Sequence, residues 1–211
     1  MFDIDGTLTD SVPMYLMSVT KSLMAMGISD IDTDYNNYKH HTDSYALRYN
    51  YERNFKKTFQ KELLDDFETN LVLQMSNFDP VKEIRGARNL IQFFKDRQVS
   101  FCFATGALPR PAILKLEQCD IWFDKKILAT SKTHESREGF VLDAIERSKA
   151  FYNKEQFDNI VSVGDGIWDL KTAQNLSIDF VGIGDRNRSK LEANGAQNCF
   201  SDLKEFKEAL F

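Results

Sequence analysis

Two aspartates one residue apart, Asp3 and Asp5, stand near the start of the sequence and are followed at once by Gly6 and Thr7. In a strand, alternate residues share a face, so both carboxylates would project near one spot. They would repel each other there unless a cation or a phosphate chemistry employs them. An Asp-x-Asp pair alone favours a solvated acidic turn. The whole string arises by chance in roughly one chain of this length per thousand, so the segment indicates functional carboxylates.

A second pair of aspartates, Asp165 and Asp169, directly follows the apolar run 160–163, within the segment Gly-Asp-Gly-Ile-Trp-Asp. If a helix begins here, the two carboxylates come onto one side of its first turn and can point at a common cation. An N-cap aspartate followed by a first-turn aspartate is the structural alternative, because the helix dipole favours both. The coincidence with the first pair favours a shared site.

A hydroxyl and a glycine, Thr105 and Gly106, follow the apolar run 99–104. A threonine in such a place is commonly a cap or turn residue. The carboxyl end of a parallel strand is also where α/β proteins bind phosphate, through a hydroxyl and free backbone N–H groups. Thr105 and Gly106 are therefore candidate phosphate-binding residues.

Short apolar runs separated by amphipathic stretches fill the second half of the sequence and must position these residues. Strands are expected at residues 99–104, 126–129, 160–163 and 180–183, and helices at 110–118, 137–151, 167–175 and 188–194, with a last helix from Asp202. This alternation is typical of βαβ units around a parallel sheet. We expect an α/β fold with a three-layer, doubly wound, Rossmann-like core.

Between residues 11 and 84 the pattern changes, because strand-like runs vanish and apolar residues recur at helical spacing. One apolar face carries Tyr15, Val19, Leu23 and Met26, and later faces carry Phe55, Phe59, Leu63, Leu64, Phe67, Leu71 and Met75. The spacing predicts helices packed around their own core. We expect residues 1–10 and 85–211 to form the catalytic core and residues 11–84 to form an inserted α-helical cap domain.

The composition is that of an ordinary globular protein, with 211 residues, 42% hydrophobic and 28% charged. The net charge is −5 and the basic residues are scattered, so no nucleic-acid partner is expected. The sequence has no apolar run of membrane-spanning length and no signal-peptide pattern, so we expect a cytoplasmic protein with no membrane partner. Cys102, Cys119 and Cys199 are widely spaced, which predicts reduced, buried thiols and neither a disulfide framework nor a zinc site.

The ordered set of Asp3-x-Asp5-Gly-Thr, a strand ending in Thr105, and Gly-Asp165-x-x-x-Asp169 resembles the haloacid dehalogenase superfamily of phosphohydrolases over nearly the whole chain. The helical insertion resembles the cap of its phosphoglycolate phosphatase-like and β-phosphoglucomutase-like branch. The resemblance implies that Asp3 is the nucleophile. It also implies that Asp5 protonates the leaving oxygen and then activates water against the aspartyl-phosphate.

The same resemblance implies a Mg²⁺ ion held by Asp3, the Asp5 carbonyl and Asp165, with Asp169 as a further ligand or acting through a bound water. A divalent cation relieves the repulsion between a carboxylate nucleophile and a phosphate, and magnesium suits an all-oxygen site. Thr105 would donate a hydrogen bond to the transferring phosphoryl group.

The family also requires a basic residue before the fourth strand, and two residues compete for this role. Lys132 is the expected residue type, but no proline follows it and it lies far ahead of the apolar pattern of the next helix. Arg137 has better spacing to that helix, and a guanidinium can bind phosphate in fork geometry. We therefore favour Arg137.

Other residues near the motifs have less definite roles. Arg48, in the cap, is a candidate for binding a substrate anion, although a surface ion pair is the favoured alternative. His40 and His41 lack a second cluster of ligands and are expected on the cap surface or facing the substrate. Trp168 is expected to pack.

The strand that bears Asp3 is expected at the centre of the sheet, yet only Met1 and Phe2 precede this residue. Typical strands run to about five or six residues, and buried ones are almost continuously apolar. We expect further apolar residues upstream of Met1, with a shortened strand as the alternative.

Together these features predict a magnesium-dependent phosphatase for a small-molecule phosphate ester, such as phosphoglycolate, a sugar phosphate or a nucleotide, acting as a monomer or homodimer. A phosphomutase, which returns the phosphoryl group to sugar, is one alternative. A catalytically silent binding protein of the same fold is another, and the intact motif aspartates disfavour it. A dehalogenase is disfavoured because its chemistry needs no second carboxylate at Asp5.

Overall fold

A parallel sheet forms the centre of the protein in the computed structural model, which describes residues 1–210. Its strands are β3 (Phe103–Thr105), β4 (Leu128–Thr130), β5 (Val161–Gly164), β6 (Asp179–Ile183) and β7 (Asn198–Phe200). Strand β3 pairs with β4, and β5 pairs with β6, which pairs with β7, all in parallel. The strands give way to loops at one edge of the sheet, where the predicted site residues lie.

Residues 1–3 lie between β3 and β5 and join the two parts of the sheet. Phe2 forms single-residue parallel bridges to Phe103 and to Val163. The Met1 amino group donates to the Val161 carbonyl at 2.9 Å, and the Asp3 N–H donates to the Val163 carbonyl at 2.9 Å. The segment therefore occupies the central place expected for it, and apolar residues upstream of it stay a prediction.

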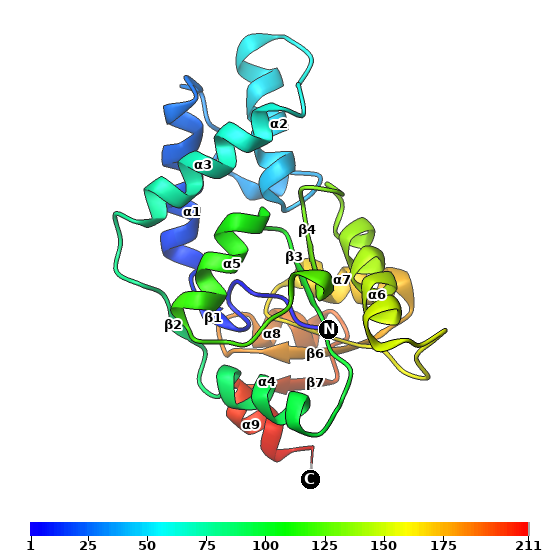
Figure 1. Ribbon diagram of the computed structural model, residues 1–211. Coiled ribbons are helices and arrows are strands. Elements are labelled where there is room, and N and C mark those ends of the chain that lie inside the picture. The colour runs from blue at the N-terminus through cyan, green and yellow to red at the C-terminus, as the bar shows by residue number, and fades with distance from the viewer. Residues whose placement is uncertain (211) are drawn as a thin grey trace.

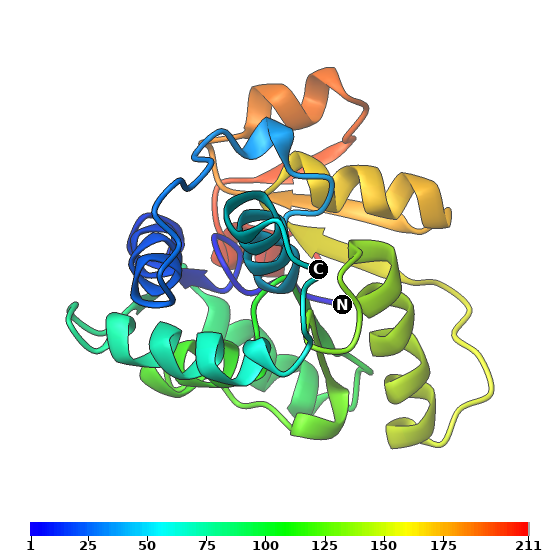
Figure 2. The same cartoon turned by 90° about the horizontal axis from the view of Figure 1, so that it is seen from above.

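Helices cover both faces of this sheet, which confirms the three-layer α/β fold. They are α4 (Ala87–Asp96), α5 (Pro109–Gln118), α6 (Arg137–Tyr152), α7 (Ile167–Leu176), α8 (Arg188–Ala193) and α9 (Leu203–Glu208), with a 3₁₀ turn η2 at Lys125–Ile127. Helix α6 packs on β3, β4 and α7, whereas α4 packs on α9, which contacts β7. Figures 1 and 2 show α6 beside α7, and α4 and α9 together at the bottom of Figure 1.

The helices between residues 11 and 84 stand above the core at the top of Figure 1. They are α1 (Val12–Ala25), the 3₁₀ turn η1 (Tyr35–Asn37), α2 (Asp43–Phe55) and α3 (Leu63–Met75). Tyr15, Val19 and Leu23 are buried on α1, as the spacing predicts, and Leu64, Phe67, Leu71 and Met75 are buried on α3. The division into a core and a cap at residues 10/11 and 84/85 stays our proposal.

Two details of this region differ from the prediction. A short strand, β2 (Lys82–Glu83), pairs antiparallel with β1 (Thr9–Asp10), so strands do not vanish there. Phe55, the last residue of α2, is 38% exposed, and its ring lies tilted against that of Tyr51 with the ring centres 4.9 Å apart. Within the described chain, no helix has both the length and the apolar character to cross a bilayer.

Candidate active site

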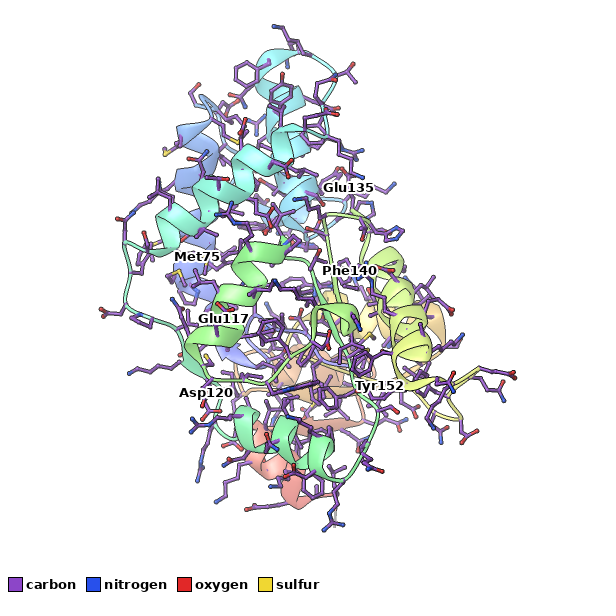
Figure 3. All side chains as sticks on the ribbon, viewed as in Figure 1. Met75, Glu117, Asp120, Glu135, Phe140 and Tyr152 are labelled. Atoms are coloured by element: carbon purple, nitrogen blue, oxygen red, sulfur yellow. The ribbon has the colours of Figure 1, made fainter. Side chains whose placement is uncertain are left out.

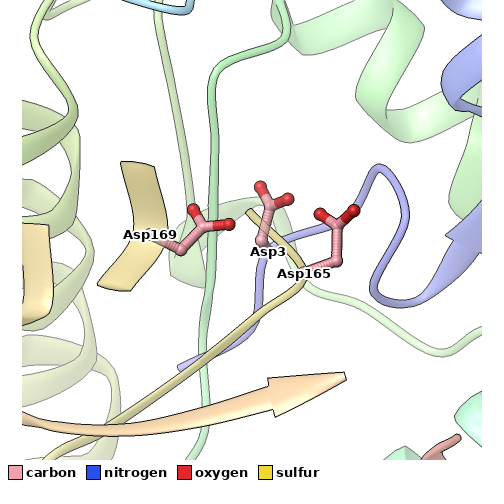
Figure 4. Close-up of side chains that lie close together, drawn as sticks. All are labelled: Asp3, Asp165 and Asp169. Atoms are coloured by element: carbon pink, nitrogen blue, oxygen red, sulfur yellow. The ribbon is translucent and has the colours of Figure 1, made fainter. Parts of the chain in front are cut away.

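The carboxylates of Asp3, Asp165 and Asp169 converge at the edge of the sheet (Figure 4), with oxygen atoms within 4.8 Å of one another. Asp3 lies on the central segment, Asp165 directly follows β5, and Asp169 lies in the first turn of α7. Asp3 and Asp169 are buried. The two motifs, far apart in sequence, thus form one acidic cluster.

Glycines around the cluster make room for the carboxylates. Gly6 has a left-handed backbone, with φ of 78°, and a Cβ atom there would run into the carboxylate of Asp165. A Cβ on Gly164 would lie 2.6 Å from Asp169. The Gly166 N–H donates to Asp169 Oδ2 at 3.0 Å, which fixes this carboxylate at the start of α7. Gly6 of the first aspartate motif and Gly164 of the second are therefore both required for steric reasons.

Burial makes the negative charge of the cluster unfavourable. It raises the pKa of Asp3 well above its usual range, and the nearby Asp169 carboxylate raises it further. Burial and then Asp169 raise the pKa of Asp165 to about 7, and burial also raises the pKa of Asp169. A set of buried carboxylates that repel one another fits a cation, and an all-oxygen donor set fits Mg²⁺.

Arg137, the first residue of α6, is the cation next to this cluster. Its Nη2 atom lies 2.5 Å from Asp169 Oδ1 and 3.5 Å from Asp3 Oδ1. Lys132 binds Asp65 at 2.7 Å and Glu68 at 2.9 Å on α3 instead. Of the two candidates for the basic residue, the structure brings only Arg137 to Asp3, and its role there stays a proposal.

Asp5 binds Lys115, a residue that its sequence context does not mark as functional. Lys115 Nζ lies 2.7 Å and 2.6 Å from the two carboxylate oxygens of Asp5, and Ser11 Oγ donates to Oδ1 at 2.5 Å. Lys115 is fully buried on α5, with Nζ 3.4 Å from the centre of the Tyr15 ring. The sequence feature that could have indicated this contact is the position of Lys115 next to Leu116 on the apolar face of a helix, because a buried charge needs a partner.

Thr105 and Gly106 lie beside the cluster at the end of β3. The buried Thr105 hydroxyl accepts a hydrogen bond from the Ala107 N–H at 3.1 Å, which is the turn role weighed for it. The Gly106 carbonyl accepts from the Asp43 N–H at 2.9 Å. A Cβ on Gly106 would lie 2.7 Å from the His41 carbonyl, so this glycine lets the cap approach the core.

Arg48 lies outside this arrangement. It pairs with Glu135, on the loop before α6, at 3.0 Å, and Figure 3 shows Glu135 close to the cap helices. Its guanidinium also lies 5.1 Å from the centre of the Tyr45 ring. Arg48 therefore forms an ion pair with Glu135, which is the alternative to substrate binding that the sequence favours.

A cavity of about 270 Å³ opens above the cluster, between the core and the cap. Its core side is lined by Asp3, Asp5, Thr105, Gly106, Ala107, Arg137, Asp165, Trp168, Arg186 and Asn187, and its other side by residues of α1, η1 and α2. Trp168 stacks on His41, with ring centres 4.6 Å apart, so the packing expected for Trp168 is confirmed at the cavity wall. The free thiols of Cys102 and Cys119 are buried, and Cys199 is half-buried.

Comparisons with known proteins agree with this architecture. The family model for haloacid dehalogenase-like hydrolases matches residues 1–176. Among solved structures, a hydrolase from Pseudomonas syringae is similar at 20% identity and a TM-score of 0.75, covering 99% of this chain and 95% of that one. CbbY from Rhodobacter sphaeroides, solved in complex with phosphate, is similar at 15% identity and a TM-score of 0.71, covering 97% and 93%.

A third similar structure is a beta-phosphoglucomutase-like protein from Bacteroides vulgatus, at 14% identity and a TM-score of 0.71, covering 98% of this chain and 84% of that one. No match was found among the curated proteins. At these identities the solved structures establish the fold. Because the family model covers most of the sequence and its motif residues meet in one site, the chain belongs to the haloacid dehalogenase-like hydrolase family.

Proposed function

We propose that this protein is a magnesium-dependent phosphatase that hydrolyses a small phosphate monoester through an aspartyl-phosphate on Asp3. The observation that carries the proposal is the position of the Asp3 carboxylate, which lines the floor of a cavity together with Asp165 and Arg137 and lies close to Asp169. A carboxylate can attack phosphorus only where the charge of both anions is offset. The phosphate bound by the similar CbbY protein supports the same substrate chemistry.

In the first half of the reaction, an Asp3 oxygen forms a bond to phosphorus as the bond from phosphorus to the leaving oxygen breaks. Asp5 gives its proton to that oxygen, and Lys115, which contacts both Asp5 oxygens, stabilises the carboxylate that remains. Arg137 and the Thr105 hydroxyl offset charge on the transferring group. A Mg²⁺ ion held by Asp3, Asp165, Asp169 and the Asp5 carbonyl would supply further charge neutralisation.

In the second half, water attacks the phosphorus of the aspartyl-phosphate and gives a proton to Asp5. The bond between phosphorus and Asp3 breaks, which releases inorganic phosphate and restores the Asp3 carboxylate together with the protonated Asp5 from which the cycle began. The same pair of aspartates therefore serves both halves of the cycle, with Asp5 acting first as acid and then as base.

The test is a panel of phosphorylated metabolites and p-nitrophenyl phosphate, assayed for released inorganic phosphate with Mg²⁺ and with a chelator. Phosphate release that depends on Mg²⁺ and disappears in the Asp3→Asn variant is expected. An isomerised sugar phosphate in place of inorganic phosphate would identify a mutase, and the absence of turnover on every ester would exclude the phosphatase.

A further inference from the structure

The wall of the active-site cavity that faces the nucleophile comes from the cap and differs in chemistry from the floor. In phosphoryl transfer, the leaving oxygen lies on the side of phosphorus opposite the attacking oxygen. A leaving group bound over Asp3 therefore extends toward the part of the cavity lined by α1, η1 and α2. The residues there are mainly aromatic and aliphatic: Val12, Tyr15, Leu16, Val19, Tyr35 and Tyr38.

This wall carries no positive charge among the residues that the structure describes. The only cationic residues that line the cavity within residues 1–210 are Arg137 and Arg186, both from the core. Arg137 is paired with Asp169 and Asp3. Arg186 is exposed and precedes Asn187, whose side chain donates to the Asp165 carbonyl at 3.0 Å. Arg186 therefore lies on the core side of the cavity, near the acidic cluster, and not on the cap wall. Burial, and then Arg137, lower the pKa of His41 to about 4, so this ring is uncharged at neutral pH.

The polar groups on the wall include one carboxylate, that of Asp43. Asp43 is buried at the start of α2, and its Oδ2 atom accepts hydrogen bonds from the Tyr15 hydroxyl and from the Leu108 N–H. Both of these hydrogen bonds are made to Oδ2, and none reaches Oδ1 from the described residues. A free carboxylate oxygen on a cavity wall can accept a hydrogen bond from a hydroxyl group, and it repels a second anion.

We propose that this cavity selects phosphate monoesters whose leaving group is uncharged, carries a hydroxyl group and presents a flat or apolar face to the tyrosines. This inference rests on the proposed phosphatase function. Nucleosides and monosaccharides both supply this chemistry. Leaving groups that carry a carboxylate or a second phosphate do not, and a mutase must hold a sugar with two phosphates between its two transfers. The chemistry of this wall therefore favours a phosphatase over a phosphomutase.

The test compares kcat/KM with Mg²⁺ within matched pairs: glycerol phosphate against phosphoglycolate, and glucose 6-phosphate against glucose 1,6-bisphosphate, with uridine monophosphate beside them. In each pair, the ester whose leaving group is uncharged is expected to have a kcat/KM about tenfold or more higher. A preference for uridine monophosphate over glucose 6-phosphate assigns a nucleoside, and the reverse order assigns a sugar. A preference for the charged members would overturn the inference while leaving the phosphatase intact, whereas no hydrolysis of any ester would remove both.

Variants of the wall make the test specific. Leu16 is 37% exposed, so Leu16→Lys can place a cation at the wall without burying it, and we expect it to narrow the preference in both pairs. The matched control is Met24→Lys on the same helix, where the side chain is 58% exposed and does not line the cavity; selectivity should stay as in the parent. Arg186→Ala should affect both members of a pair alike. A selective loss on the bisphosphate would show that Arg186 holds a second anion, and this would overturn the inference.

Discussion

At the scale of single residues, the two aspartates of the first motif have separable roles. Asp3→Asn is expected to reduce turnover on the order of a thousandfold or more, because the amide keeps the shape but loses the charge that attacks phosphorus. It should also weaken Mg²⁺ binding, since the Asp3 side chain belongs to the acidic cluster. Asp5→Asn should lower turnover by about 10²- to 10⁴-fold but keep Mg²⁺ binding, because its proposed ligand is the backbone carbonyl.

Isothermal titration with Mg²⁺ and phosphate-release assays on both variants check this division. Circular dichroism serves as the control for folding. Equal loss of Mg²⁺ affinity in Asp3→Asn and Asp5→Asn would contradict the proposed division of roles between the two aspartates.

The two candidates for the basic residue form a second matched pair. Arg137 contacts Asp169 and Asp3, whereas Lys132 contacts the cap residues Asp65 and Glu68. Arg137→Ala should lower kcat by about 10²- to 10³-fold, the usual loss when a donor to a developing anion is removed. The kcat of Lys132→Ala should stay within about twofold of the parent, because this lysine pairs with Asp65 and Glu68 of α3 and does not contact the acidic cluster. The reverse ranking in steady-state kinetics would transfer the role to Lys132.

Lys115 acts through Asp5, so the loss of kcat on removing this lysine should depend on the leaving group. In Lys115→Met, we expect kcat to fall by about 10- to 100-fold on an alkyl phosphate. The fall should be smaller on p-nitrophenyl phosphate, whose leaving group needs less protonation. A merely structural role would lower both rates alike.

The double variant Lys115→Met with Asp5→Asn provides the control. If Lys115 acts through Asp5, the double variant should be no slower than Asp5→Asn alone. An additional loss in the double variant would show that the lysine has an independent role.

The sequence predicts the aspartates but not Lys115, the partner of Asp5, for a physical reason. Asp3, Asp5, Asp165 and Asp169 lie within short strings that are rare by chance and tied to strand ends. Lys115 meets Asp5 across 110 positions, and such a contact depends on how the helix packs on the core, which local spacing does not encode. The choice of Arg137 as the candidate beside the cluster rested on its place at a helix start, a local feature that sequence does carry.

At the scale of the elements, Gly6 links the loop after the first motif to the loop after β5. Gly6→Ala should cost about 1 to 2 kcal/mol for the left-handed backbone, and it should also displace Asp165 because the added Cβ meets that carboxylate. Gly27→Ala is the matched control, with φ of 80° and its nearest neighbour at an ordinary 3.9 Å. Thermal unfolding should show a similar decrease in Tm for both variants, because both place a Cβ on a left-handed backbone. The affinity for Mg²⁺ should fall in Gly6→Ala alone.

Most of the expected elements that rest on apolar runs or clear helical spacing agree with the structure. Two expected strands are shorter than predicted: β3 begins at Phe103 and not at residue 99, and residues 126–127 belong to the 3₁₀ turn η2, so β4 begins at Leu128. Helix α6, expected at residues 137–151, spans Arg137–Tyr152, and α7, expected at 167–175, spans Ile167–Leu176. The strand β7 was not predicted, because its three residues are exposed or half-buried and form no apolar run. Helix α4 was also missed, although its buried residues Ala87, Leu90 and Ile91 follow helical spacing.

At the scale of the whole molecule, the acidic cluster ties stability to pH and to metal. The pKa of Asp165 is about 7 in the folded protein and about 3.9 in an unfolded chain. The folded state then binds more protons between these values, so this group makes the metal-free protein less stable as pH rises from about 4 to about 7. Mg²⁺ binds the ionised carboxylates, so the increase in Tm on adding Mg²⁺ should be larger at about pH 8 than at about pH 5.

Differential scanning calorimetry with and without Mg²⁺ measures this dependence. Asp165→Asn is the control, because an amide neither titrates nor carries the charge, and its Tm should respond less to both Mg²⁺ and pH. A shift in Tm that is independent of pH in the parent protein would exclude the acidic cluster as the site of Mg²⁺ binding.

The central position of residues 1–3 has a consequence for how the chain folds during synthesis. The Met1 amino group pairs with a carbonyl 160 positions away, and Phe2 bridges Phe103 and Val163. Contacts of such long sequence separation form late, because closing the intervening loops costs entropy first. The segment that carries the nucleophile is thus made before both of its partner strands and is paired on both sides only after β5 has emerged from the ribosome. Until then Phe2 and Ile4, which are fully buried in the finished protein, are exposed apolar residues, so we expect incomplete chains to aggregate or to engage chaperones.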